Sequence, residues 1–479
     1  MKNIGRTELG ILTALGVIAT CLFAAVAILF AYEVADRRGL LVDAAPSTSA
    51  ASTTAMPTAV LLPSSTTAPL PITPSTPVPR ATNTLVISKE SVNDRLLQTI
   101  EQKMVSLRNL SPVEPVNRRF LTVTDLRDLL STWYAQDNPL DDVAIRQRLY
   151  VALDFVRPGV DLNLIQDELM ARNIAGLYNA EDKQLYIVSD RWNMTASEEM
   201  TFAHEFTHAM QDQHYHLLSF DERARTLDEQ LANTALIEGD ATLAMSFYAV
   251  RNLSQRDVDE MIYSAAQWDQ GELTDIPSPI TQITLFPYQG GLTFVQALYQ
   301  ASNSWSLVDN AFAIPPLSTE QILHVEKYLT EPDVPLRIAL PALDETMGGS
   351  WNEIDRGVLG EFLIGLYLAQ GTDQMSAARG AAGWGGDSYA LLTDGEGRWL
   401  FALRSVWDTA TDAEEFFAAY AQKMSDNADA QQIALEAARG YWRLPDREVY
   451  ASRQGKDALL IIAPDRTALD RALHWFPGY

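Results

Sequence analysis

The sequence is poor in cysteine and in basic residues, and both shortages exclude classes of protein. Cys21 is the one cysteine among 479 residues, so neither a disulfide framework nor a thiolate zinc finger can form. Lys and Arg number 36 against 62 Asp and Glu, which gives a formal net charge of -26. This balance argues against nucleic-acid binding and against a polybasic contact with anionic lipid, since both need a basic surface. Hydrophobic residues make up 47% of the chain, which is typical of a folded protein with one to three domains.

An uncharged apolar run lies near the N-terminus. Residues 9–32 carry no charge, and as a helix this run would span about 36 Å, enough to cross a hydrocarbon core of about 30 Å. Lys2 and Arg6 precede the run, so the positive-inside rule favours a cytoplasmic head at residues 1–8 and extracytoplasmic C-terminal domains. We therefore predict a single transmembrane helix and a location in the cell membrane. A signal peptide cleaved near Ala27 is the alternative.

A linker is predicted after this run, over residues 33–87. Between residues 46 and 79 no side chain is charged, and Ser, Thr, Pro and Ala dominate. Such a composition cannot bury enough apolar surface to offset its ordering entropy, and the prolines favour an extended chain. The linker would hold the folded part, from residue 88 onward, away from the membrane.

The folded part begins with helical periodicity and then changes to strands. Residues 174–178 and 184–188 are apolar with β-branched or aromatic members, and the polar residues 179–182 separate them, which predicts a β-hairpin. Thr195 and Glu198 have the spacing of a capping box that opens a helix. The predicted helices are 92–107, 125–135, 141–155, 163–172, 195–215 and 221–250.

The helix predicted over 195–215 contains the motif H-E-x-x-H at His204, Glu205 and His208. Residues four apart on a helix lie about 40° apart around its axis, so both imidazoles can bind one ion. Glu205 projects from the same turn toward a water on that ion. Two histidines with no ligand on a helix are the simpler alternative. The motif indicates a zinc site with a general base beside it.

The next helix supplies carboxylates in apolar surroundings. Between residues 231 and 250 only Glu238 and Asp240 are charged, and a helix that is apolar on all sides is buried. A buried carboxylate needs a cation or a firm hydrogen-bond partner. Zinc held by the two histidines could serve one carboxylate, but not both, because they point about 200° apart. A buried Arg or Lys elsewhere is the alternative partner.

At this point the sequence resembles the gluzincin metallopeptidases, which carry H-E-x-x-H on one helix and a ligand glutamate on the next. The resemblance implies that Glu238, in the run L-I-E-G-D-A, is the third zinc ligand beside His204 and His208. It also implies an edge strand that binds substrate by β-addition before the active helix, a role that would fall to residues 184–188.

Two residues compete for the stabilisation of the oxyanion. Tyr288, in F-P-Y-Q-G-G, looks like the tyrosine of the P-Y-x-x-G element in the gluzincin branch that includes aminopeptidase N, where its hydroxyl stabilises the oxyanion. The G-x-M-E-N element of that branch is absent from the sequence, which argues against aminopeptidase specificity. His324 is the other candidate, in the second turn of a helix that Ser318 and Gln321 would cap.

Asp212, His214 and His216 follow His208 in the sequence. Asp212 lies four residues after His208 and could orient one imidazole by a hydrogen bond. His214 and His216 are predicted not to bind the metal, because His214 is turned to another face of the helix.

The C-terminal residues 344–479 have a different character. A helix is predicted at 357–369, strands at 388–392, 399–407, 448–452 and 458–463, and helices at 412–423 and 467–474. The glycine-rich stretch 380–387 lacks the lysine and fixed spacing of a phosphate loop, so we interpret it as a turn before a strand. This order predicts a small α+β domain. The elements H-A-M-Q-D-Q-H, I-E-G-D-A-T and G-W-G-G-D resemble those of uncharacterised bacterial extracytoplasmic proteins.

Together these patterns predict an α+β chain, with a mostly helical zincin-like domain at 88–343 that contains a small sheet and with the small α+β domain at 344–479. The predicted activity is zinc-dependent hydrolysis of peptide bonds in a peptide or protein substrate, with Glu205 as general base. Two alternatives stay open: a non-catalytic cell-surface binding module that reuses the fold, and a zinc hydrolase of a non-peptide substrate. The sequence gives no oligomeric state.

Overall fold

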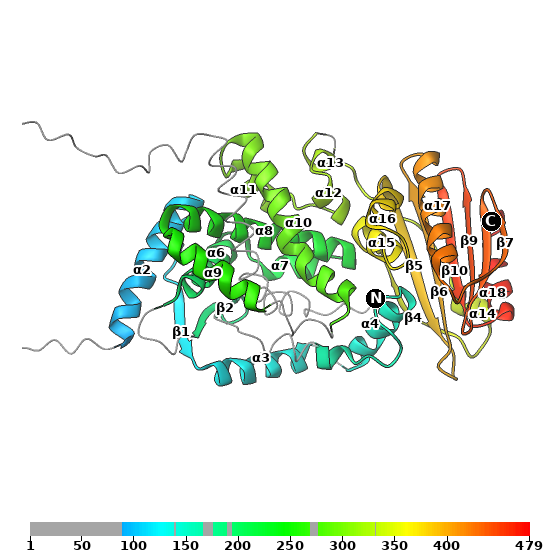
Figure 1. The fold of residues 1–479 in the computed structure, drawn as a ribbon, viewed down its shortest axis with the longest axis horizontal. Helices are drawn as coiled ribbons and strands as arrows, with labels where there is room; N and C mark the ends of the chain where they lie inside the picture. Colours follow the sequence, from blue (N-terminus) through cyan, green and yellow to red (C-terminus); the bar gives the residue numbers. More distant parts are fainter. Residues whose placement is uncertain (1–88, 138–139, 166–175, 189–193, 269–275, 331) are drawn as a thin grey trace, which may run out of the picture.

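The computed structural model describes residues 89–479, except 138–139, 166–175, 189–193, 269–275 and 331. Helices make up most of the first part of this region, and a large sheet lies at its end (Figure 1). This mixture confirms the predicted α+β class. The predicted membrane helix at 9–32 and the linker at 33–87 lie outside the described residues. Among the helices that are described, none combines the length and the apolar character that crossing a bilayer requires.

The helices of the first part are α2 (Lys89–Arg108), α3 (Val123–Asp137), α4 (Leu140–Ala152), α6 (Ala196–Tyr215), α7 (Leu218–Arg223), α8 (Leu227–Asn252), α9 (Gln255–Trp268), α10 (Ser278–Ser302), α11 (Ser306–Ala313), α12 (Thr319–Leu323) and α13 (Glu326–Leu329). The single helix predicted over 221–250 is wrong at its start. Thr226 caps α8 by accepting a hydrogen bond from the Glu229 N–H, and α7 is a separate short helix. Most of the helix predicted at 163–172 lies outside the described residues.

A three-stranded sheet lies before α6. It consists of β1 (Asn117–Leu121), β2 (Gly176–Asn179) and β3 (Gln184–Val188), in the order β1-β3-β2. The predicted hairpin is confirmed, since β2 and β3 pair antiparallel from Gly176 opposite Ile187 to Asn179 opposite Gln184. The prediction that 184–188 forms an edge strand is wrong, because β1 pairs with its other side in parallel register. The free edges of this sheet therefore belong to β1 and β2.

The C-terminal part is built on a seven-stranded antiparallel sheet in the order β4-β5-β6-β10-β9-β8-β7. Its elements are α14 (Leu343–Met347), β4 (Asn352–Gly357), α15 (Gly360–Leu368), α16 (Gln374–Ala381), β5 (Trp384–Thr393), β6 (Trp399–Trp407), α17 (Ala410–Asp426), β7 (Gln431–Glu436), β8 (Arg439–Arg443), β9 (Glu448–Gln454), β10 (Asp457–Ala463) and α18 (Arg466–Leu473). Only residues 382–383 of the glycine-rich stretch form the predicted turn, with Gly383 at φ +75°. The prediction is wrong for the rest of the stretch, because α16 extends to Ala381 and β5 already begins at Trp384.

Helices cover both faces of this sheet, and its side chains alternate accordingly. On β6, Phe401 and Leu403 face the helices α15 and α17 and share their hydrophobic cluster. Leu400 and Ala402 point the other way, into a second cluster with residues of α14 and α18. This period of two is that of a strand buried on both faces. The C-terminal part is therefore a three-layer arrangement, with the sheet in the middle (Figure 1).

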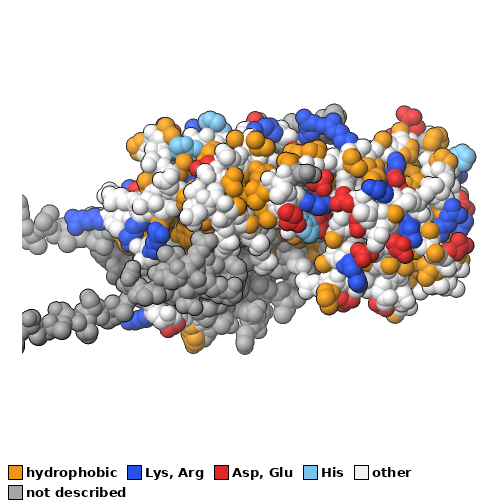
Figure 2. Space-filling model, turned by 90° about the horizontal axis from the view of Figure 1, so that it is seen from above, with side chains coloured by type: hydrophobic (Ala, Val, Ile, Leu, Met, Phe, Trp, Pro, Cys, Tyr) orange, Lys and Arg blue, Asp and Glu red, His pale blue; other side chains and the backbone are white. Residues whose placement is uncertain are grey.

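The helical and C-terminal parts share one hydrophobic cluster. It contains Leu236 of α8, Leu363 of α15 and the side chains on the face of the large sheet that α15 and α17 cover. Polar contacts add to this junction, since Asp154, after α4, pairs with Lys423 at 3.0 Å and Arg447 at 2.8 Å. On the face seen in Figure 2, acidic and basic side chains are interspersed over the described surface of this end of the molecule.

Candidate metal centre

The helix that carries H-E-x-x-H has the predicted start. The Thr195 side chain accepts from the Glu198 N–H, and the Glu198 carboxylate accepts from the Thr195 N–H at 2.6 Å, which completes the capping box. From Met200 to Asp212 every residue of α6 is buried. The helix therefore runs through the core and presents His204 and His208 to an interior site.

Helix α8 lies beside α6 and brings Glu238 to the two imidazoles. Glu238 Oε2 lies 3.0 Å from His204 Nε2 and 3.4 Å from His208 Nε2, and the two Nε2 atoms are 3.0 Å apart. Tetrahedral zinc with bonds of about 2.0–2.1 Å separates its ligand atoms by about 3.3 Å. The three donor atoms thus lie close enough together to bind one metal ion, and their separations are near those of a zinc site. The structure brings together the three predicted ligands.

The three side chains strongly affect one another's pKa. Burial would raise the pKa of Glu238, but the two imidazoles beside it lower this pKa, so that the carboxylate is ionised. Burial lowers the pKa of His204. For His208 burial acts in the same direction, but the Glu238 carboxylate outweighs it and raises the pKa. The Glu238 Oε1 atom is buried without a hydrogen-bond partner in the described structure. An ionised, buried carboxylate with a free oxygen provides a place for a metal ion.

Glu205 lies next to this group and is held by the backbone of an edge strand. Its Oε2 atom accepts a hydrogen bond from the Tyr178 N–H of β2 at 2.7 Å. Burial raises the pKa of Glu205 to about 8, although His208 and the Tyr178 N–H act against this shift. The edge strand beside the site is therefore β2, not the predicted strand 184–188. A carboxyl group with a raised pKa is suited to general acid–base catalysis near neutral pH.

Tyr288 reaches the same site from a third helix. The motif F-P-Y-Q-G-G does not form a turn: it lies inside α10, with Pro287 within the helix. The Tyr288 ring is buried, and its centroid is 6.2 Å from that of His204. Burial, the carboxylates of Glu238 and Glu205, and a hydrogen bond with Glu238 raise the pKa of Tyr288 well above its ordinary value. The hydroxyl therefore keeps its proton and can act as a hydrogen-bond donor.

Two glycines let α8 and α10 approach closely enough for this arrangement. A Cβ atom on Gly291 would lie 2.0 Å from the Ala235 carbonyl oxygen, and one on Gly239 would lie 2.2 Å from the Gly291 carbonyl oxygen. Both distances are far below van der Waals contact, so the backbones touch where other residues would hold them apart. The close approach brings Tyr288 and Glu238 to one site from neighbouring helices.

His324 lies on the other side of α10. It is the C-cap of the five-residue helix α12, not a residue of a second helical turn as predicted. Its Nε2 lies 2.8 Å from Glu361 Oε1, and the pKa of His324 is raised chiefly by this hydrogen bond. Phe286 of α10 stacks on Phe362, the neighbour of Glu361, at 4.0 Å. Phe286 and Tyr288 point about 200° apart on a helix, so the structure does not bring His324 to the three ligands.

Sequence reasoning missed the residue that orients an imidazole. Asp212 does not contact either histidine ligand: its side chain accepts from the Tyr178 hydroxyl at 2.9 Å and from the Leu217 N–H at 3.0 Å. Gln211 makes the contact instead, with its Oε1 atom 2.8 Å from His208 Nδ1. Helical spacing could have indicated Gln211. Side chains three and four residues after His208 are both its neighbours on the helix surface, and Gln211 is three residues after it.

The two further histidines of this helix lie away from the three ligands. His214 is exposed, and its Nε2 atom lies 2.7 Å from the Ser111 carbonyl oxygen. His216 ends α6 in the left-handed conformation, at φ 57°. Neither belongs to the group of three ligands, in agreement with the prediction.

Asp240 has a partner of its own. Arg108, at the end of α2, donates to Asp240 Oδ1 from Nε at 2.6 Å, and both side chains are fully buried. The two carboxylates of α8 thus have different partners, since Glu238 faces the imidazoles and Asp240 faces a buried arginine. Of the two partner types expected from the sequence, the buried arginine serves Asp240.

A second acidic group has a different occupant. Glu320, Asp333 and Asp408 lie close enough together to hold a cation. The Lys327 ammonium lies among them, at 2.5 Å from Glu320, 3.0 Å from Asp333 and 2.6 Å from Asp408. The lysine therefore already supplies the positive charge at this site.

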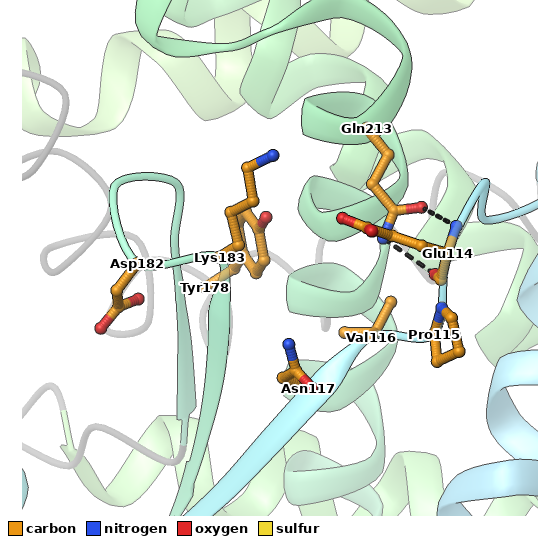
Figure 3. A pocket seen from close by; sticks show the side chains of 8 residues that line it. All are labelled: Glu114, Pro115, Val116, Asn117, Tyr178, Asp182, Lys183 and Gln213. Atoms are coloured by element: carbon orange, nitrogen blue, oxygen red, sulfur yellow. Dashed lines mark hydrogen bonds between the residues drawn. The ribbon is translucent and has the colours of Figure 1, made fainter.

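A cavity of about 380 Å³ lies beyond the C-terminal end of α6 (Figure 3). Tyr178 and Lys183 of the β2–β3 hairpin and Gln213 of α6 line it, together with the connection between α2 and β1. Gln213 bonds the backbone of this connection, accepting from the Glu114 N–H at 3.1 Å and donating to the Glu114 carbonyl at 3.0 Å. None of the three ligands lines the cavity.

Comparison with known proteins gives one match. A family model described as Domain of unknown function (DUF8575) matches residues 346–473, the part from α14 through the seven-stranded sheet to α18. No curated protein and no solved structure matches the chain. The match leaves the metal centre outside its range.

Proposed function

We propose that the chain is a zinc-dependent hydrolase of peptide bonds, built like the gluzincin metallopeptidases. The observation that carries the proposal is the convergence of His204, His208 and Glu238 within 3.0–3.4 Å of one another, with Glu205 beside them. Two imidazoles and one carboxylate are a usual ligand set for catalytic zinc, which keeps its fourth position for water or substrate. By the sequence, residues 9–32 would anchor this enzyme in the cell membrane.

The chemistry follows from the residues around the three ligands. Bound zinc would lower the pKa of a water molecule toward neutrality. Glu205, which the Tyr178 N–H holds beside the ligands, would take a proton from the attacking water and pass it to the leaving nitrogen. Tyr288 donates its hydroxyl hydrogen to the oxyanion of the tetrahedral intermediate. The hydroxyl has this hydrogen because burial and two carboxylates keep it protonated.

A metal site that only stabilises the fold is the second candidate, and one observation favours it. His204, Glu205, His208 and Glu238 are between 0% and 2% exposed. A structural site, however, is normally closed by four protein ligands, and the described residues offer a group of three. A buried base beside the ligands has no purpose in a structural site.

Zinc analysis and one conservative variant test the proposal together. The full-length protein, purified in detergent, should bind one zinc ion, and Glu238→Ala should lose it. Glu205→Gln should keep the zinc and the fold but lose hydrolysis of a broad peptide library. A wild-type protein that holds zinc and cleaves no peptide would favour the structural site or a non-peptide substrate. A protein that binds no zinc would refute the proposal.

A further inference from the structure

We infer that Gln211 is a positioning residue for the zinc ligand His208, and that Asp240 and Arg108 fix its orientation. This inference rests on the proposed function for the identity of the metal. It concerns a chain of buried side chains that begins at the imidazole and ends on α2, 132 residues away from Asp240 in the sequence.

The hydrogen bonds of Gln211 determine which way its amide points. Its Nε2 group donates to the Ile237 carbonyl oxygen at 3.0 Å and to Asp240 Oδ2 at 2.9 Å. Both partners can only accept, the second because an ionised carboxylate has no hydrogen. The two amide hydrogens are therefore used, and Oε1 must face His208.

The amide oxygen in turn selects the tautomer of the imidazole. Gln211 Oε1 lies 2.8 Å from His208 Nδ1 and can only accept a hydrogen bond, so Nδ1 carries the hydrogen. The neutral ring then has its lone pair on Nε2, the atom that faces Glu238 and His204. A fixed tautomer and ring orientation raise the affinity of a histidine ligand for its metal.

Asp240 and Arg108 keep this arrangement in place. Asp240 accepts from Arg108 Nε at 2.6 Å and has no exposed surface. The guanidinium also bonds Asp309 at 2.7 Å and lies over the Trp305 ring at 4.4 Å. Because the guanidinium is paired through Nε and Nη2 and packed against Trp305, it holds the Asp240 carboxylate that Gln211 contacts in place.

Only one of the two imidazoles is held in this way. The Nδ1 atom of His204 has no hydrogen-bond partner in the part of the chain that the structure describes. His208 is therefore the histidine whose ring is fixed before the metal binds. Loss of Gln211 should mainly lower the affinity of the site for the metal.

The experiment compares two glutamines on the same helix. Gln211→Leu removes the acceptor for His208 and should weaken zinc binding by about 10- to 100-fold. Gln213→Leu is the matched control, because Gln213 also makes three hydrogen bonds but only to the backbone. One joins it to Val113 and two join it to Glu114, and the latter two are drawn in Figure 3. It should change zinc affinity less than about threefold, since its contacts are not with a ligand. Zinc affinity of the full-length protein is measured by competition with a chromophoric chelator, and folding by circular dichroism.

A second variant distinguishes positioning from a general loss of stability. Gln211→Glu keeps an acceptor opposite His208, and a protonated carboxyl can still donate to Asp240. This variant should keep wild-type zinc affinity even if its unfolding midpoint falls. Equal losses of affinity in Gln211→Leu and Gln213→Leu, or an equal loss in both Gln211 variants, would overturn the inference. Absence of zinc from the wild-type protein would instead refute the proposed function.

Discussion

The contact between α8 and α10 predicts that even alanine in place of Gly291 would force the two helices apart. A Cβ atom at this position would lie 2.0 Å from the Ala235 carbonyl oxygen. Carbon and oxygen atoms that are not bonded approach to about 3.3 Å, so the two helices would have to separate by about 1 Å. The obstacle is backbone, and no change of rotamer relieves it.

Such a separation has two consequences of different size. Overpacking of a core costs about 1–3 kcal/mol, while alanine in place of glycine returns about 1 kcal/mol through helix propensity. The net loss of stability is then about 1–2 kcal/mol. We expect a loss near the upper end of this range, because the clash is with a backbone atom. The effect on catalysis is larger, because Tyr288 moves with α10 and a misplacement of 1 Å can reduce the rate by about 100-fold.

Gly290 provides the control, one residue earlier on the same helix. A Cβ atom there would meet the Phe286 ring at 2.9 Å, a side chain that can shift by a few tenths of an ångström. We expect Gly290→Ala to have stability within about 1 kcal/mol of the wild type, since propensity offsets the strain. Urea unfolding, zinc content and peptide turnover would be measured for both variants. If Gly291→Ala matches Gly290→Ala in stability and turnover, the close helix contact does not position Tyr288 and this reasoning is wrong.

Two further predictions separate the roles of Tyr288 and His324. Tyr288→Phe should lower kcat by about 10²–10³ while zinc content and KM stay close to wild type, because only an oxyanion donor is lost. His324→Ala should keep turnover but lose stability, by about 1 kcal/mol at pH 6, a value reduced for solvent screening of a partly exposed pair. Because Glu361 raises the pKa of His324, its contribution is complete below the unfolded pKa of about 6.5 and disappears as pH rises through the folded pKa. Urea unfolding of both proteins at pH 6 and pH 9 checks the sign, and a zinc-replete His324→Ala without turnover would transfer the oxyanion role to His324.

The helix with the H-E-x-x-H motif, and the grouping of His204, His208 and Glu238, could be predicted because their signals are local. The capping box at Thr195, the spacing of His204 and His208, and a carboxylate within an apolar helix each depend on a few neighbouring residues. Glu238 needed one more step, the rule that a buried charge requires a partner. The hairpin was predictable for the same reason, because its alternation and its turn are contiguous in the sequence.

Features that depend on pairing between distant segments were missed. The strand β1 has the sequence N-R-R-F-L, whose mostly exposed residues show no clean alternation, and its parallel pairing with β3 turned the expected edge strand into a central one. The strands β4 and β7 lie at the two edges of the large sheet. β7 is exposed along its whole length, so it lacks the apolar pattern by which strands are recognised.

The two carboxylates of α8 show why burial alone could not assign their roles. Glu238 and Asp240 are both fully buried and separated by one glycine. The sequence indicated that each of the two carboxylates needs a cation or another firm partner. It could not show that Arg108 is the partner of Asp240, because Arg108 lies 132 residues earlier, at the end of another helix. Arg108 pairs with Asp240, while the nearest neighbours of Glu238 are two imidazoles. Under the proposed function a metal ion would bind between Glu238 and these imidazoles. Gln211, which contacts both His208 and Asp240, connects the Arg108–Asp240 pair to that group.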